Sequence, residues 1–243
     1  TASENNCQLV MCGYNFVDHY GNIKNCTNVM PKRLYQDGEV KQLLFSTLGA
    51  APKDLEDNIL GMSVWRGLYS MQTIRDYNIQ FPSERELICE DAIFHIDFFH
   101  HIDRAYLIEQ PLYFYCNNPG SLSRVFRKDR LEKDKILYYR EYEMLRDYGS
   151  LEQGKTYIDR MFLTFTRVFL TEAVYHLEGK DSRQWIRQTL QDELLVQILK
   201  DYPYKLNPKK QRLFNMIMVH KSTVIAYLLL KVAAYRKKKF YQE

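Results

Sequence analysis

The sequence predicts an α/β fold over residues 1–127 followed by an α-helical region over residues 128–243. Apolar runs bounded by turn residues, typical of buried strands, come before residue 127, and apolar residues at three- and four-residue spacing come after it. Ten glycines and seven prolines are few for 243 residues, whereas nineteen tyrosines and thirteen phenylalanines are many. This composition favours helices and aromatic packing over a loop-rich sandwich.

The first part alternates strand and helix signals. The apolar run from Cys7 to Tyr14 predicts a buried strand, and the turn at 18–22 makes residues 8–29 a candidate hairpin. The remaining elements expected in this part are a helix over 39–50, an extended segment or single turn over 63–69, a short helix over 71–77, a helix from about residue 90 to 101, two short strands around Pro111 within 104–115, and a loop over 117–121.

The second part predicts helices over 128–148, 151–178, 182–201, 208–220 and 222–238. Gly149, Gly179, Pro203 and Pro208 separate them. Residues 158 to 169 of the second helix carry apolar side chains at the spacing of a core face.

Charge and cysteine content limit the classes of protein. Five cysteines without a CxxC pair indicate reduced thiols rather than a disulfide framework or a zinc ribbon. From Tyr202 onward there are ten Lys or Arg against Glu243 alone, so a basic tail follows a mildly acidic body. The longest apolar run, Val224 to Leu230, is far shorter than the roughly 20 residues of a membrane span. The sequence therefore predicts a soluble or peripheral protein with an anionic partner surface.

Two adjacent carboxylates, Glu90 and Asp91, open a run rich in aromatic residues and histidines. At 100° per residue, Glu90 falls on a polar strip of the expected helix and is explained by the helix dipole. Asp91 falls among Phe94, Phe98 and His95, where lost solvation would raise the pKa of its carboxyl group and suit it to accept a proton. The competing interpretation makes Asp91 the N-cap of the helix.

A metal site is a third interpretation of the same run. Asp91 and His95 lie one helical turn apart, at about 160° and 200° around the helix from Ile93, but His100 and His101 fall on other faces, at about 340° and 80°. Because these side chains do not converge, the sequence predicts no metal site here.

The order of several short motifs resembles the second half of the catalytic domain of bacterial family 2 glycosyltransferases of the GT-A fold, which bind nucleotide-diphospho-sugars. The motifs, which cover about residues 7–127, are Cys12-Gly13-Tyr14, Trp65-Arg66-Gly67-Leu68-Tyr69, Ile79-Gln80-Phe81-Pro82, Glu90-Asp91, Tyr113-Phe114-Tyr115 and Asn118-Pro119-Gly120-Ser121-Leu122-Ser123-Arg124. Members of this family build capsules, exopolysaccharides and lipopolysaccharide. The resemblance implies transfer of a sugar from a nucleotide-sugar to a glycan or lipid-linked acceptor, with inversion.

The resemblance also implies roles for individual residues. Asp91 would be the catalytic base that deprotonates the acceptor hydroxyl, and Glu90 would support it. The acceptor would bind at Trp65, Arg66 and Tyr69, although a core position for Trp65 is an equal alternative. The residues implied in a loop that closes over the donor diphosphate are Ser121, Ser123 and Arg124.

One feature departs from the family pattern. Such enzymes hold the diphosphate through a divalent Mg or Mn ion on an Asp-x-Asp motif, and no two aspartates of this chain are separated by one residue. The family places that motif ahead of the region matched here. We therefore expect a partial GT-A domain lacking its N-terminal half: residues 1–127 as the acceptor side, residues 128–243 as a helical extension, metal ligands mostly outside the chain, and no transfer by the isolated chain.

The C-terminal helix and basic tail favour a cytoplasmic enzyme that is peripheral at the inner face of the membrane, with basic side chains at anionic headgroups. A helix packed on the bundle with a solvated charged end is an equal interpretation. A different class, a helical interaction or nucleic-acid-binding module using the tail, is the alternative function, although no helix-turn-helix spacing supports it. A regulatory relic of the fold without activity is a third.

Overall fold

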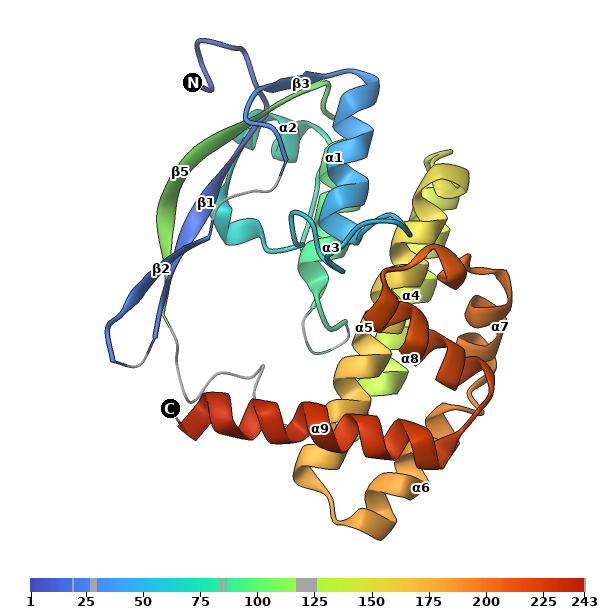
Figure 1. The fold of residues 1–243 in the computed structure, drawn as a ribbon. Coiled ribbons are helices and arrows are strands. Elements are labelled where there is room, and N and C mark those ends of the chain that lie inside the picture. The colour runs from blue at the N-terminus through green and yellow to red at the C-terminus, as the bar shows by residue number, and fades with distance from the viewer. Residues whose placement is uncertain (19, 27–29, 84, 86, 117–125, 243) are drawn as a thin grey trace.

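Strands from distant parts of the chain form a curled sheet on one side of the molecule (Figure 1). The computed structural model describes residues 1–242 apart from 19, 27–29, 84, 86 and 117–125, and of residues 237–242 it describes the backbone alone. The strands are β1 (Leu9–Val17), β2 (Ile23–Cys26), β3 (Leu34–Gln36), β4 (Gly67–Tyr69) and β5 (Arg104–Cys116). Within the described residues they are ordered β2-β1-β5-β3, and β4 also pairs with β1.

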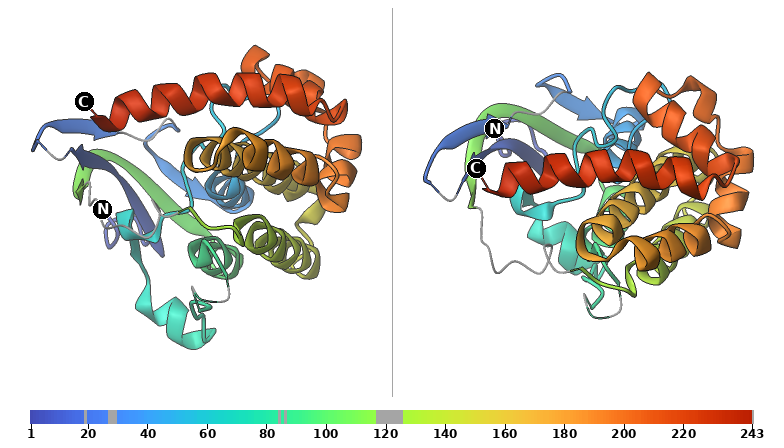
Figure 2. Two further views of the ribbon diagram at one scale, coloured as in Figure 1. Left: turned by 90° about the horizontal axis from the view of Figure 1, so that it is seen from below. Right: turned by 60° about the horizontal axis from the view of Figure 1, so that its bottom comes forward.

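Helices pack against the sheet and continue into a second layer. The helices are α1 (Gly38–Leu48), α2 (Met71–Asp76), α3 (Glu90–His100), α4 (Arg130–Asp147), α5 (Leu151–His176), α6 (Gly179–Thr189), α7 (Glu193–Asp201), α8 (Lys209–Val219) and α9 (Thr223–Gln242), with 3₁₀ turns η1 (Val64–Arg66) and η3 (Tyr204–Leu206). Helices α1 and α3 lie between the sheet and the pair α4 and α5, and α9 crosses α5 (Figures 1 and 2). The fold is therefore mixed α/β with a helical layer, as the sequence predicts.

The centre of the sheet is the parallel pair β1 and β5, which confirms one sequence prediction and corrects another. Strands β1 and β2 form the expected antiparallel hairpin. Residues 104–115, expected as two short strands around Pro111, instead belong to the single strand β5. Pro111 is accommodated because it stands opposite Gly13 at an irregularity of the register, where a missing N–H costs no regular ladder bond. The Asn15 side chain also donates to the Pro111 carbonyl at 2.7 Å.

The helical layer follows the expected elements with one difference. The segment 182–201, expected as one helix, is divided into α6 and α7. Asp192 ends the continuity because its carboxylate accepts a hydrogen bond from the Leu195 amide at 3.1 Å and so caps α7. Within the described residues, every helix is too short or too polar to cross a lipid bilayer.

A buried arginine connects the two layers. Arg160 of α5 is almost fully buried, and its guanidinium donates to four main-chain carbonyl groups between residues 51 and 56. Its Nε atom donates to Asp57 at 3.0 Å, and Arg167 donates to the same carboxylate at 2.6 Å. A buried guanidinium with all donors satisfied is tolerated, so the segment 51–57 is fixed to α5. The predicted boundary between residues 127 and 128 stays a prediction.

Candidate active site

The first turn of α3 places Asp91 beside the segment that carries Trp65. Cys89, not Asp91, occupies the N-cap position of α3, and no side-chain cap bond is made there. The interpretation of Asp91 as the N-cap is therefore wrong. Its Oδ2 atom instead accepts a hydrogen bond from the main-chain N–H of Val64, at 3.3 Å.

Cys89 gives the chain an unusual turn at this point. Its φ angle is 62°, in the left-handed region that non-glycine residues rarely adopt. Such a conformation costs on the order of 1–3 kcal/mol and persists where the surrounding structure enforces it. The turn directs the first residues of α3, and so the Asp91 carboxylate, toward the 64–66 segment.

The environment of Asp91 makes its carboxyl group a weaker acid than usual. Burial raises the pKa of Asp91 from 3.8 to about 6, the Val64 hydrogen bond opposes this rise, and the negative charge of Glu90 adds to it. A carboxyl group that titrates near neutral pH can accept a proton from a hydroxyl group and release it again. Glu90 lies beside Asp91 in the same turn and acts on it through charge.

Tyr69 lies beside Asp91 and is held by α3. Its hydroxyl group makes a 2.8 Å hydrogen bond with Nε2 of the fully buried His95. Burial and the positive charge of Arg66 lower the pKa of His95 to about 3, so its imidazole is neutral. Burial, and then the charge of Asp91, raise the pKa of the Tyr69 hydroxyl. Tyr69 is therefore a neutral hydroxyl group that is fixed to α3 through His95 and lies within range of the Asp91 charge.

Arg66 is buried beneath this group of residues. The Cys12 thiol donates to its main-chain carbonyl at 3.3 Å, which fixes η1 against β1. Burial lowers the pKa of Arg66, while the nearby Tyr14 and Tyr69 oppose the shift. Because its side chain is largely withdrawn from solvent, Arg66 supports the site from below rather than forming its surface.

Trp65 belongs to a partly exposed aromatic cluster, defined as Tyr14, Trp65, Tyr113 and Tyr115. Its ring centroid lies 4.4 Å from that of Tyr113, 5.3 Å from that of Tyr115 and 5.2 Å from that of Tyr14. The parallel register brings Tyr14 opposite Tyr113. Tyr113 and Tyr115 stand in one of the motifs of the resemblance but were not among the predicted site residues, because the sequence does not show the pairing of β1 with β5 that brings them to Trp65.

The predicted site residues thus divide into two groups. The structure brings together Asp91, Glu90, Trp65, Arg66 and Tyr69. The predicted donor-loop residues Ser121, Ser123 and Arg124 lie outside the described residues.

The part of the chain that the structure describes contains no group of three His, Cys, Asp or Glu residues able to hold a metal ion. Asp91 and Glu90 alone do not make the ligand set that a divalent ion needs. The described residues therefore supply no complete ligand set for the divalent ion that the resemblance implies, and the prediction that its ligands lie mostly outside this chain stays a prediction.

Comparison with known proteins relates the chain to a glycosyltransferase. No family model matches the chain. It is 26% identical over 149 residues to the uncharacterized glycosyltransferase EpsJ of Bacillus subtilis (strain 168), covering 58% of this chain and 42% of that protein. The chain thus spans less than half the length of this curated relative. The match relates the chain to a glycosyltransferase and leaves the family 2 and GT-A assignments as predictions.

Two solved structures are also similar. The crystal structure of S. aureus TarS 1-349 in complex with UDP-GlcNAc has a TM-score of 0.49 at 14% identity, covering 98% of this chain and 62% of that one. The structure of TarS 1-349 alone has a TM-score of 0.46 at 14% identity, covering 98% and 60%.

Proposed function

We propose that this chain is the acceptor-side part of a GT-A glycosyltransferase of family 2, followed by a helical extension. The enzyme would transfer a hexose-type sugar from a nucleotide-sugar to a glycan or lipid-linked acceptor during synthesis of bacterial capsule, exopolysaccharide or lipopolysaccharide. The observation that carries the proposal is the Asp91 carboxyl group, with its pKa raised to about 6, held by the Val64 N–H beside Trp65.

In the proposed reaction, Asp91 accepts the proton of the acceptor hydroxyl as its oxygen forms a bond to the anomeric carbon of the donor. The bond from that carbon to the diphosphate oxygen breaks at the same time, and the nucleoside diphosphate leaves with the electron pair. Displacement from the opposite side inverts the anomeric centre. The exposed aromatic cluster offers the acceptor ring an apolar face.

Most contacts to the donor would come from residues outside this chain. We assign the diphosphate contacts of this chain to Ser121, Ser123 and Arg124, and the Mg or Mn ion to ligands elsewhere in the enzyme. The isolated chain is accordingly inactive. This assignment follows from the motif resemblance and from the lack of an Asp-x-Asp pair in the sequence.

The enzyme would act in the cytoplasm at the inner face of the membrane. Helix α9 supports this location because its only deeply buried positions are Ala226, Leu230 and Ala234 among its described side chains. The exposed apolar side chains of the same helix are Val224, Ile225, Leu228, Leu229, Val232 and Tyr235. An apolar face followed by the basic run at 236–239 suits an anionic leaflet.

The test is Asp91→Asn in an enzyme that carries this chain together with a donor-binding half. Removal of a general base lowers the rate of a proton-transfer step by about 10²–10⁴-fold. We expect a loss of that size in sugar transfer, measured with radiolabelled donor, and an unchanged Kd for the nucleotide-sugar, measured by calorimetry.

Asp134→Asn is the matched control. Burial also raises the pKa of Asp134 to about 6, but this carboxyl group of α4 is almost fully buried and accepts a hydrogen bond from Arg130, so a substrate does not reach it. We expect near-normal transfer by this variant. Turnover retained in Asp91→Asn, or lost equally in both variants, would refute the assignment of the base.

A further inference from the structure

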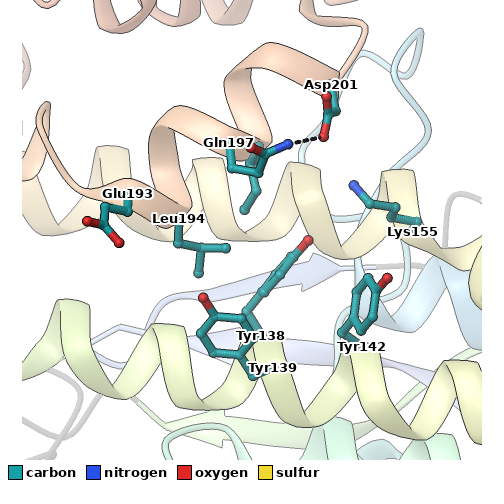
Figure 3. A pocket seen from close by; sticks show the side chains of 9 residues that line it. Tyr138, Tyr139, Tyr142, Lys155, Glu193, Leu194, Gln197 and Asp201 are labelled. Atoms are coloured by element: carbon teal, nitrogen blue, oxygen red, sulfur yellow. Dashed lines mark hydrogen bonds between the residues drawn. The ribbon is translucent and has the colours of Figure 1, made fainter.

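A hollow of about 490 Å³ opens between α4, α5 and α7, and its lining is unlike that of the site described above (Figure 3). Tyrosine side chains project into it from α4, Lys155 reaches in from α5, and polar side chains border it from α7 (Figure 3). Its volume falls in the range of small-molecule sites, roughly 300–1,000 Å³. None of its lining residues lies on η1, β4 or α3, which carry Trp65, Tyr69 and Asp91.

The wall of the hollow offers aromatic surface to solvent. The Tyr139 side chain is 52% exposed, and Tyr142, one turn later on α4, is partly exposed. Leu194 and Ile198 of α7 supply buried apolar surface opposite. Exposed tyrosine rings have an apolar face and a polar tip, so they suit a ligand whose surface also combines C–H and O–H groups.

The charges of the hollow select against anions. Lys155 donates to the buried Asp159 at 2.7 Å, so its positive charge is already paired. Tyr138 donates to the same carboxylate, also at 2.7 Å. The exposed carboxylates of Glu193 and Asp201 remain at the rim. Because the local charge is negative, a phosphate group or an acidic sugar would be repelled.

Polar groups at the rim of the hollow can accept hydrogen bonds from a ligand. The Gln197 amide donates to Asp201 at 2.6 Å, which leaves the amide carbonyl and the second carboxylate oxygen for a ligand (Figure 3). Carboxylate and amide groups of this kind accept hydrogen bonds from hydroxyl groups. The hollow therefore combines exposed aromatic faces, apolar floor and hydroxyl-binding acceptors without a free positive charge.

We propose that the hollow between α4, α5 and α7 is a second carbohydrate site, which binds an uncharged stretch of oligosaccharide away from the reacting centre. The proposal rests on the proposed function, since a glycosyltransferase that extends a glycan binds such a chain during its reaction. Its role is to hold the acceptor or product chain by sugar units that are not reacting.

The experiment measures binding by the chain itself, without donor or turnover. The probes are the neutral tetrasaccharides maltotetraose and chitotetraose and, as an anionic counterpart, tetragalacturonate, each followed by saturation-transfer NMR and calorimetry. We expect at least one neutral probe to bind and the anionic probe not to bind. Binding of neither neutral probe at 10 mM, roughly the weak limit for a specific site, or stronger binding of tetragalacturonate, would overturn the proposal.

The variant is Tyr139→Ala, whose side chain is half exposed and so can be shortened without loss of the fold. We expect Kd for the neutral probe to rise roughly tenfold, since the variant loses the aromatic face on which a sugar ring stacks. Tyr235→Ala on α9, where the side chain is 71% exposed and outside the hollow, is the matched control and should bind as the parent does. Equal binding by Tyr139→Ala and the parent would overturn the proposal.

Failure of the proposed function would look different. Asp91→Asn should bind the neutral probe as the parent does, whatever its turnover. Oligosaccharide binding that depends on Tyr139 would then stand even if Asp91 were not the base, and loss of this binding would leave the assignment of Asp91 intact.

Discussion

Two aspartates of this molecule share a perturbed acidity but lie in different surroundings. Burial is the largest cause that raises the pKa of both Asp91 and Asp134 to about 6. Asp91 stays partly exposed, accepts one main-chain hydrogen bond and faces the segment of Trp65. Asp134 is 1% exposed and is bound by Arg130 at 2.8 Å. Only Asp91 is accessible to a substrate.

The surroundings of Asp134 show what a raised pKa means without access. Glu141, two turns along α4, is also buried, and burial followed by the charge of Asp134 raises its pKa well above the usual value. Among the described residues, Asp134 Oδ2 and Glu141 Oε1 have no hydrogen-bond partner. These two carboxyl groups destabilise the folded state when they are charged, whereas the carboxyl group of Asp91, whose pKa is also raised, can be reached by solvent and substrate. Access to solvent therefore distinguishes a candidate catalytic carboxyl group from one whose raised pKa only reflects unfavourable burial.

The largest expected effect is the pH dependence of transfer. A base must be deprotonated to work, so kcat/KM of the complete enzyme should fall tenfold per pH unit below about 6, the value of Asp91 in the free enzyme. Rates measured from pH 4.5 to 8 define this acidic limb of the profile of kcat/KM against pH. Asp134→Asn should leave the midpoint of the limb at the same pH. A limb near pH 4, the usual range of an aspartate, would contradict the role of Asp91.

The stability that Glu141→Gln gains over the parent should increase as pH rises. The pKa of Glu141 is raised in the folded state, so between the unfolded and folded values the unfolded chain binds fewer protons and stability falls with increasing pH. Gln carries no such proton. We expect the variant to gain about 1–3 kcal/mol over the parent at pH 8 and much less at pH 4.5, measured by urea unfolding.

Glu143→Gln is the matched control for this measurement, since its side chain is 53% exposed on the same helix. It should change stability little at either pH. A gain by Glu141→Gln that did not depend on pH would show that packing, rather than the proton, causes it.

Much of the fold follows from local sequence signals. Ser70 is the N-cap of helix α2, because its Oγ accepts a hydrogen bond from the Thr73 amide at 3.2 Å. The hairpin of β1 and β2 turns where residues 18–22 predict it. One error came where tertiary structure overrides a local rule, because Pro111 lies inside a strand at a point where Gly13 stands opposite. The other was a missed local signal, because the Asp192 side chain caps α7 and so divides a helix that the apolar spacing would continue.

The site was predictable as a set of residues but not as an arrangement. The motifs locate Glu90-Asp91 and the Trp65 segment, yet the Val64 hydrogen bond to Asp91 joins positions 27 apart. Arg160 and Glu141 were not foreseen as buried, since a charged residue on a helix normally faces solvent. Only their partners or the surrounding packing explain burial, and neither is visible in a sequence.

Val64→Pro removes the one main-chain donor to Asp91 that the described residues provide. Proline suits this position because Val64 begins η1 and the preceding Ser63 is extended, with φ −69° and ψ 122°. The hydrogen bond from Val64 lowers the pKa of Asp91, so its loss should move the limb of kcat/KM to higher pH by up to about one unit. Val64→Ala keeps the N–H and shortens the same side chain; an equal shift in this variant would assign the effect to packing.

The smallest expected effect is that of Glu90→Gln. The charge of Glu90 is the last of the causes that raise the pKa of Asp91, so its removal should move the limb of kcat/KM to lower pH by a few tenths of a unit. The rate at pH 8 should stay within about threefold of the parent, because Glu90 acts on Asp91 through charge alone. A much larger loss at pH 8 would mean that Glu90 contacts the reacting groups itself, and that the two adjacent carboxylates share the work that we assign to Asp91.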